Sequence, residues 1–412
     1  MTQRAKNIPE LRFPEFVNEG EWKVEKLGEI LFKNSAKNKN LNHSLVQSVS
    51  NKYGFINQDE YFDNRIIASK DTSNYYVIKK GYFAYNPSRI DVGSLAYKHD
   101  DATSIISPLY VSFRANNEKI CDLFLLNWFS SENFKQQMIF EGGVRNTLNY
   151  ENLTEIKIAL TSITEQQKIA SCLSSLDEVI AAHSQKLELL KEHKKGLMQN
   201  LFPQEGEKAP KYRFKEFKGE WKEKALGAVA ENIMYGMNAS AVEFDGENKY
   251  IRITDINENS RLFLPNPLTS PDGQLEEKYL INVGDLLFAR TGASVGKSYL
   301  HQNECGKIYF AGFLIRFTIK NAIPYFVYAQ TLTEHYQKWV SKTSMRSGQP
   351  GINAEEYKSY PIFLPTTIEE QQKIASCLLA LDELITAQAE KIEQLKQHKK
   401  GLMQGLFPKI NE

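Results

Sequence analysis

The 412-residue sequence has almost no excess charge of either sign, since 51 lysines and arginines face 50 aspartates and glutamates, for a net charge of +1. It therefore lacks the overall cationic field that marks many nucleic-acid-binding proteins. It also lacks an apolar segment near its start and any run approaching eighteen uncharged apolar residues. Because secretion signals and membrane-spanning helices need such segments, we expect a cytoplasmic protein.

Cysteine and histidine are scarce and scattered. The four cysteines (Cys121, Cys172, Cys305 and Cys377) form no C-x-x-C pair, so neither a disulfide framework nor a structural zinc site is predicted. The seven histidines form no H-E-x-x-H motif and no triad-like set, so no metal ion and no catalytic residue is predicted. With 42% hydrophobic residues, the chain nevertheless has enough apolar material for two or three globular domains.

What the sequence does have is a long internal repeat. Residues 161–203 and 366–408 align without a gap and match at 30 of 43 positions, including the strings EQQKIASCL and HKKGLMQ. A weaker echo joins residues 12–28 with residues 213–227, whereas the regions between these markers hardly match. Such a repeat indicates a duplication, so the chain consists of variable, constant, variable and constant segments.

Each constant segment is predicted to be a helix of about 38 residues, or about 57 Å. Apolar residues recur at alternating spacings of four and three, which is typical of a helix that pairs along a narrow seam. Because each stripe needs a partner, we expect the two helices to pair as an antiparallel coiled coil about a pseudo-two-fold axis. His183 and Lys194 interrupt the first stripe, and Gln388 and Lys399 the second; such residues either set the register or extend their polar ends to solvent. The predicted seam consists of Ile169, Leu173, Leu176, Ile180, Leu187 and Leu190 in the first helix, and Ile374, Leu378, Leu381, Ile385, Ile392 and Leu395 in the second.

The variable segments are predicted to be compact domains of mixed α/β (α+β) type. Stretches 279–288 and 307–317 have the pattern of strands, whereas 121–138 and 325–340 have the pattern of helices. One such domain would lie at each end of a rigid spacer. The expected organisation is a first domain in 1–160, a helix in 161–203, a linker in 204–212, a second domain in 213–365 and a second helix in 366–408.

This plan, the two EQQKIA helix openings and the segment YLINVGDLLFARTGASVGKS (279–298) closely resemble the specificity subunits of Type I restriction-modification systems. The resemblance covers essentially the whole chain. It implies a non-catalytic subunit that recognises a bipartite double-stranded DNA target, each variable region being a target recognition domain for one half. It also implies two methyltransferase subunits bound at the helices, endonuclease–translocase subunits in the full complex, and S-adenosylmethionine, ATP and magnesium only on those partners. The alternative function is a coiled-coil scaffold for protein partners without DNA specificity.

The glycine-containing segment 292–298 is similar to a phosphate-binding loop, but it has three residues between its glycines where that loop needs four. Nucleotide hydrolysis is therefore not predicted. The segment follows a predicted strand, so it forms either a plain hairpin turn or a turn that brings Arg290 and backbone amides to DNA. The resemblance favours the second alternative. In the first domain, the corresponding residues 81–84 (GYFA) depart from the family's G-D-L-L pattern.

Loops that carry arginine, glutamine or asparagine are candidates for base recognition, because these side chains make bidentate contacts in the major groove. Two such loops lie at residues 142–146 and 346–351. A bland surface loop is the alternative in each case. The predicted DNA-binding residues are Lys52, Tyr53, Arg89, Arg145 and Asn146 in the first domain, and Arg252, Thr254, Arg290, Thr291, Ser294, Lys297, Arg346 and Gln349 in the second.

Overall fold

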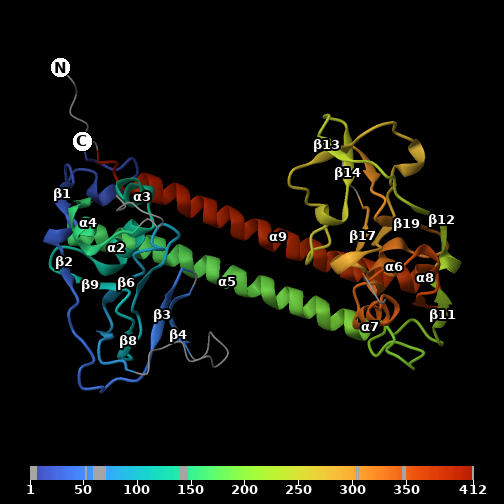
Figure 1. Ribbon diagram of the computed structural model, residues 1–412, viewed down its shortest axis with the longest axis horizontal. Coiled ribbons are helices and arrows are strands. Elements are labelled where there is room, and N and C mark those ends of the chain that lie inside the picture. The colour runs from blue at the N-terminus through green and yellow to red at the C-terminus, as the bar shows by residue number, and fades with distance from the viewer. Residues whose placement is uncertain are drawn as a thin grey trace. The chain divides into compact units, whose positions relative to one another are not determined.

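The computed structural model describes residues 7–51, 53–58, 71–138, 147–302, 304, 306–345 and 349–410. The chain forms two compact units (Figure 1), of which the first contains residues 1–184 and 390–412 and the second residues 185–389. The unit boundaries cross both long helices, α5 (Ile163–Leu201) and α9 (Ile368–Leu406). Each unit therefore consists of one globular domain, the first half of one long helix and the second half of the other.

The first domain is built on a four-stranded antiparallel sheet with the strand order β2-β9-β6-β7. Three antiparallel two-stranded ribbons accompany it, namely β1-β10, β3-β4 and β5-β8. The strands are β1 (Lys23–Lys26), β2 (Leu31–Lys33), β3 (Gln47–Ser50), β4 (Gly54–Asn57), β5 (Tyr76–Ile78), β6 (Tyr82–Tyr85), β7 (Leu95–Tyr97), β8 (Ser104–Ile106), β9 (Val111–Ala115) and β10 (Lys157–Leu160), and the helices are α2 (Asp122–Phe129), α3 (Glu132–Gln137) and α4 (Tyr150–Glu155).

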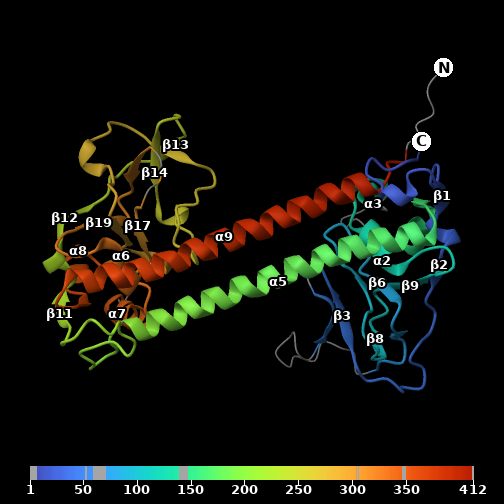
Figure 2. The same cartoon turned by 180° about the vertical axis from the view of Figure 1, so that it is seen from behind.

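The second domain has the equivalent four-stranded sheet, with the order β12-β19-β16-β17. Its ribbons are β11-β20 and β13-β15, which are antiparallel, and β14-β18, which is parallel. Helix α8 lies beside β12 in both views (Figures 1 and 2), where the Tyr235 hydroxyl accepts a hydrogen bond from the Ala354 amide (3.1 Å). The strands are β11 (Lys222–Ala225), β12 (Ala230–Tyr235), β13 (Ala241–Glu243), β14 (Asn248–Ile251), β15 (Thr269–Pro271), β16 (Asp285–Ala289), β17 (Ser298–Leu300), β18 (Lys307–Phe310), β19 (Leu314–Ile319) and β20 (Pro361–Leu364), and the helices are α6 (Pro324–Gln330), α7 (Glu334–Thr343) and α8 (Ala354–Lys358).

The two domains have the same central sheet although their sequences hardly match. In both sheets an inner strand, β6 or β16, follows a glycine with positive φ, Gly81 (88°) or Gly284 (92°), a conformation that glycine adopts without steric penalty. The Gly81 amide donates to the Lys98 carbonyl (3.0 Å), as the Gly284 amide does to the His301 carbonyl (2.8 Å). The variable regions therefore differ in their side chains and in their accompanying ribbons, but not in the order of the central strands.

The helical stretches predicted at residues 121–138 and 325–340 are each two helices. The first is broken between α2 and α3, and the second between α6 and α7. At these breaks the hydroxyls of Ser131 and Thr333 accept a hydrogen bond from a backbone amide three residues later, which starts a new helix. The apolar pattern continues through both breaks, so it does not reveal them.

Helices α5 and α9 pair within each unit, which confirms the predicted architecture of two mixed α/β domains, each followed by a long helix. In the first unit, Lys399 Nζ lies 2.6 Å from both carboxylate oxygens of Asp177. In the second unit, the equivalent Lys194 pairs with Asp382. Each pair joins the first half of one helix to the second half of the other, so the helices run antiparallel in both units. Such cross-helix ion pairs favour one alignment of the helices, which supports the register-setting role of the two lysines.

The predicted seam residues lie in two environments. At the helix openings, Ile169 and Leu173 belong to the hydrophobic core of the first domain, and Ile374 and Leu378 to that of the second. Nearer the helix centres, Ile392 is buried, and the half-buried residues are Leu176, Ile180, Leu187, Leu190, Leu381, Ile385 and Leu395. The first turns of each helix therefore pack on a globular domain. The seam between the two helices consequently contains fewer of the apolar residues than predicted.

Candidate functional site

The repeated glutamate at the start of each long helix attaches the helix to its globular domain. Glu165 accepts two hydrogen bonds from the guanidinium of Arg12 (both 2.8 Å), and Glu370 accepts two from Arg213 (2.7 and 2.8 Å). Both carboxylates are buried. A buried carboxylate is tolerated only when it is paired, so each bidentate pair fixes one domain on one helix.

The glutamine that follows has an equally specific role. Gln166 accepts a hydrogen bond from the Cys121 amide (2.9 Å) at the start of α2, and Gln371 accepts one from the Ile323 amide (3.0 Å) at the start of α6. The first amides of a helix have no partner inside that helix, so a side-chain oxygen satisfies them. The repeated Glu-Gln pair is therefore structural, which explains why it recurs between domains that differ.

A turn follows β16 in the second domain. Residues 290–292 pair with residues 350–352 through two backbone hydrogen bonds of 2.9 and 3.0 Å and an antiparallel bridge. Gln349 lies beside this turn, with its amide nitrogen 3.2 Å from the position that a Cβ of Gly292 would take. The structure thus brings together two loops that the sequence analysis predicted separately.

Arg290 lies near two aromatic rings that the sequence analysis did not single out. Its guanidinium carbon is 4.9 Å from the ring centre of Tyr235 and 5.9 Å from that of Phe313. Tyr235 is 38% exposed and Phe313 60% exposed. We call these three residues the Arg290 cluster. Their separation in the chain leaves no local sequence signal, apart from an aromatic residue in the turn between β18 and β19.

The guanidinium of Arg290 has no hydrogen-bond partner for its Nε among the described residues. Cation–π contacts hold a guanidinium in place without a carboxylate to neutralise it. Because Arg290 is half-buried and its Nε is shielded from solvent, a contact with a phosphate or with the O6 and N7 atoms of guanine would come from the terminal nitrogens of the guanidinium.

Two other predicted contacts are engaged within the second domain. Lys297 is 6% exposed, and its ammonium pairs with Glu258 (2.5 Å) and with a backbone carbonyl (3.2 Å). Arg252 donates two hydrogen bonds of 2.8 Å to Asp255, and Thr254 is exposed beside it. A cation that is buried and already neutralised gains little from DNA, so the position of Lys297 favours a structural role over the predicted contact.

The first domain has a different side chain at the equivalent turn. The Pro87 carbonyl accepts a hydrogen bond from the Leu148 amide (3.1 Å), the same bond that the Arg290 carbonyl accepts in the second domain. Proline therefore stands where the second domain has its arginine. The predicted contacts Arg89 and Tyr53 are both exposed, and they offer the first domain other side chains for a ligand.

The structure gives few contacts for the remaining predicted DNA-binding residues. Ser294 is half-buried in the short 3-10 helix Gly292–Ser294. Lys52, Arg145, Asn146 and Arg346 lie outside the described residues. Within the described ranges, His, Cys, Asp and Glu side chains form no group of three or more that could hold a metal ion, and no helix there has the length and apolar character needed to cross a membrane.

Two segments, residues 19–192 and 218–397, match the family model described as the Type I restriction modification DNA specificity domain. Together they cover most of the sequence. The chain belongs to this family. It is thus a specificity subunit of a Type I restriction-modification system, a non-catalytic class of subunit, and it carries the specificity domain twice.

This specificity subunit is similar to its relatives along most of their length. The type I restriction enzyme MjaVIII specificity subunit of Methanocaldococcus jannaschii is 25% identical over 311 residues, which cover 73% of this chain and 72% of that protein. The S subunit from M. genitalium has a TM-score of 0.57 at 13% identity, with 98% of this chain and 100% of that chain covered. A chain from a structure that concerns complex assembly and conformational transition of the type I R-M system has a TM-score of 0.58 at 17% identity. The match covers 94% of this chain and 98% of that chain. At these identities the solved structures show the fold alone.

Replacing Arg290 with alanine is expected to weaken specific DNA binding by the specificity subunit by about 1–3 kcal/mol, the value of a bidentate base contact. Binding to the target and to unrelated duplexes should be measured over a range of salt concentrations. A base contact lowers affinity for the target alone, whereas a phosphate contact lowers it for all sequences and makes the salt dependence shallower. Lys338→Ala removes the same charge from an exposed position on α7 and is the matched control. Unchanged affinity and preference in Arg290→Ala would contradict a DNA-contacting role for the Arg290 cluster.

Proposed function

We propose that this specificity subunit recognises a bipartite double-stranded DNA sequence, with one globular domain reading each half. The observation that carries the proposal is that two domains with one central strand order present different side chains at equivalent positions. Arg290 corresponds to Pro87, and His301 corresponds to Lys98. One scaffold that carries two sets of side chains is what two different half-sites require, because base recognition depends on the placement of a few side chains.

In the second domain, the proposed contact surface is the Arg290 cluster together with Thr291 and Gln349. Arginine and glutamine are side chains that read guanine and adenine in the major groove, and an exposed aromatic ring beside them can contact the methyl group of thymine. In the first domain, Tyr53 and Arg89 are proposed contacts. We place the two target recognition domains in residues 1–160 and 213–365.

The outer faces of α5 and α9 are the proposed docking sites for two methyltransferase subunits. A partner that binds twice needs two like surfaces, and residues that are identical and exposed on both helices provide them. These residues are Gln167 and Gln372, Ser171 and Ser376, and Glu178 and Glu383. Val179 and the equivalent Leu384 add exposed apolar side chains, 43% and 54% exposed, which are suited to packing against a partner helix.

Catalysis is assigned to the other subunits of the complex. S-adenosylmethionine would bind to the methyltransferase subunits, and ATP and magnesium to endonuclease–translocase subunits. A complex that acts on chromosomal DNA would work in the cytoplasm.

Exchanging residues 213–365 for a different variable domain is expected to change one half of the DNA target and leave the other half unchanged. The reason is that each domain has its own hydrophobic core, one built around Trp22 and Phe124 and the other around Trp221 and Phe326. Sequencing of methylated bases in cells that carry the assembled system reads out both half-sites. The unmodified chain in the same host is the control. If both half-sites changed together, the two domains would not read DNA independently; if no sequence preference were found with either chain, the scaffold function would be favoured.

A further inference from the structure

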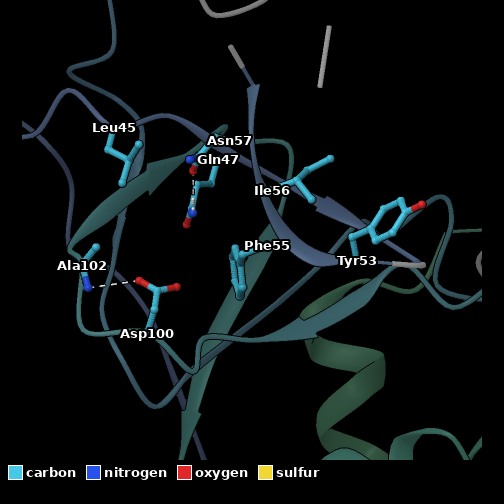
Figure 3. Close-up of a pocket in the computed structure, with 8 residues that line it drawn as sticks. All are labelled: Leu45, Gln47, Tyr53, Phe55, Ile56, Asn57, Asp100 and Ala102. Carbon is cyan, nitrogen blue, oxygen red and sulfur yellow. Dashed lines mark hydrogen bonds between the residues drawn. The ribbon is translucent and has the colours of Figure 1, made fainter. Parts of the chain in front are cut away.

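The first domain contains a cavity of 490 Å³ that lies between the β3-β4 ribbon and the loop after β7 (Figure 3). None of the residues at the turn that corresponds to the Arg290 cluster lines it. Its apolar walls come from Phe55, Ile56 and Tyr53, and its polar lining from Gln47, Asn57 and Asp100; Leu45 and Ala102 complete it. The volume lies within the range of pockets that hold small molecules or single chemical groups of a larger ligand.

A fully buried lysine organises the polar lining. Lys98 is 0% exposed, and its ammonium donates to both oxygens of Asp100 (2.7 and 2.8 Å) and to Gln47 Oε1 (2.8 Å). These three bonds use all three donors of the ammonium. The side-chain carboxylate of Asp100 faces the cavity (Figure 3) and is about half exposed, at 55%. The buried lysine thus provides the counter-charge, while the half-exposed carboxylate remains open to a ligand.

The side-chain amides of Gln47 and Asn57, which also belong to the polar lining, have defined orientations. Gln47 Oε1 also accepts a hydrogen bond from the Ser104 hydroxyl (2.7 Å), so the oxygen end of the amide is fully used. Its nitrogen donates to Asn57 Oδ1 (3.0 Å), a bond drawn in Figure 3. The Asn57 amide nitrogen has no hydrogen-bond partner among the described residues. The cavity therefore presents a donor from Asn57 and an acceptor from Asp100 beside an aromatic wall.

We propose that this cavity reads a base that presents an exocyclic amino group in the major groove, adenine or cytosine, in the half-site recognised by the first domain. The inference rests on the proposed function and names a reading site within it. A carboxylate accepts hydrogen bonds from an amino group but repels the carbonyl oxygens O6 of guanine and O4 of thymine. The Asn57 amide nitrogen complements it, because it can donate to the ring nitrogen N7 that lies next to the amino group of adenine.

The charge of the site is compatible with DNA. An isolated carboxylate beside the phosphate backbone is repelled, but here the buried ammonium neutralises it at a hydrogen-bonded distance. Its hydrogen bond to Lys98 also lowers the pKa of Asp100, so this group stays an acceptor at neutral pH. The Lys98–Asp100 pair is neutral overall, so it adds nothing to the net charge of the sequence.

The second domain has a different polar pair at the same backbone position. His301 corresponds to Lys98, is also buried, and its Nδ1 lies 2.7 Å from Glu304 and 3.2 Å from the Tyr299 hydroxyl. The scaffold thus places a buried basic side chain with a carboxylate partner at one point in both domains. The chemistry around that point differs, as expected where two domains read different bases.

The test uses the full chain assembled with its methyltransferase partner. Two variants, Asn57→Ser and Asp100→Asn, are compared with the unmodified chain by sequencing methylated bases, and then by binding to duplexes in which each base of the first half-site is replaced in turn. Both variants are expected to lose discrimination at the same single position by about 5- to 150-fold. In the unmodified complex that position holds adenine or cytosine, and the second half-site stays unchanged in both variants.

Asn117→Ser is the matched control, because Asn117 is exposed in the same domain and does not line the cavity. Asp100→Asn leaves Lys98 without its counter-charge, so thermal unfolding is measured for each variant; Asn57→Ser removes no charge and carries the test if Asp100→Asn does not fold. Unchanged discrimination in folded Asn57→Ser overturns the inference, as does an affected position that holds guanine or thymine. A complete lack of sequence preference in the unmodified complex would instead overturn the proposed function.

Discussion

Replacing Glu370 with alanine is expected to lower the free energy of unfolding of the second unit by about 3–5 kcal/mol, the usual cost of removing one member of a buried ion pair. Glu370 is 1% exposed and accepts two hydrogen bonds from Arg213 and a third from Trp221 Nε1 (3.2 Å). Alanine would leave the guanidinium without an anionic partner and the buried indole N–H without an acceptor. Each of these groups would then carry an uncompensated desolvation cost.

Urea unfolding of the full chain, followed by tryptophan fluorescence, measures this loss. Glu369→Ala is the matched control, since Glu369 precedes Glu370 in α9 and is exposed. Its effect is expected to stay within about 0.5 kcal/mol, as for most surface substitutions. Equally small losses in both variants would show that the Arg213–Glu370 pair does not hold the second domain on α9.

Inserting seven residues into both long helices, near Leu187 and Ile392, is expected to lengthen the non-specific spacer between the two DNA half-sites by about three base pairs. A heptad keeps the apolar stripe in phase and adds about 10 Å to each helix. B-DNA rises about 3.4 Å per base pair, which gives the expected change. Because three added base pairs also rotate one half-site about the duplex axis, a folded complex that has lost specific binding is the other result consistent with a helical ruler.

Duplexes with spacers of different lengths, together with sequencing of methylated bases, measure this effect. The control is the same seven-residue insertion in the linker at 204–212, which lies outside α5 and α9 and should leave the spacer unchanged. Both half-sites should keep their sequences in every variant that binds. Full affinity for the original spacer after insertion into both helices would contradict the ruler and strengthen the alternative of a protein scaffold.

Much of the architecture could be predicted because it depends on residues that repeat or recur at a regular spacing. The two EQQKIA openings and the two HKKGLMQ strings reveal the duplication directly. The four-three spacing of apolar residues follows from helix geometry, so it predicts long paired helices without knowledge of the rest of the fold. The seam lysines Lys194 and Lys399 were recognised as exceptions to the stripe, but their partners Asp382 and Asp177 come from the opposite helix and were not identified.

The candidate binding residues could be predicted only in part. The turn after β16 was expected from its glycines and its arginine, and the structure places Arg290 beside two aromatic rings, with no hydrogen-bond partner for its buried Nε among the described residues. Lys297, seven residues along and in the same glycine-containing segment, is buried against Glu258. Whether a lysine near a turn faces solvent or the core depends on strands and loops that lie far away in the chain.

The sequence by itself determined the duplication, the two long helices, their mutual pairing and the family, because these depend on local periodicity and on one segment resembling another. Only the tertiary structure decided which side chains meet: Tyr235 and Phe313 near Arg290, or Lys98 bonded to Asp100 and Gln47. The physical reason is that each of these sites joins residues from separate strands and loops. No spacing in the sequence encodes such a contact, since it exists only once the sheet has brought its strands together.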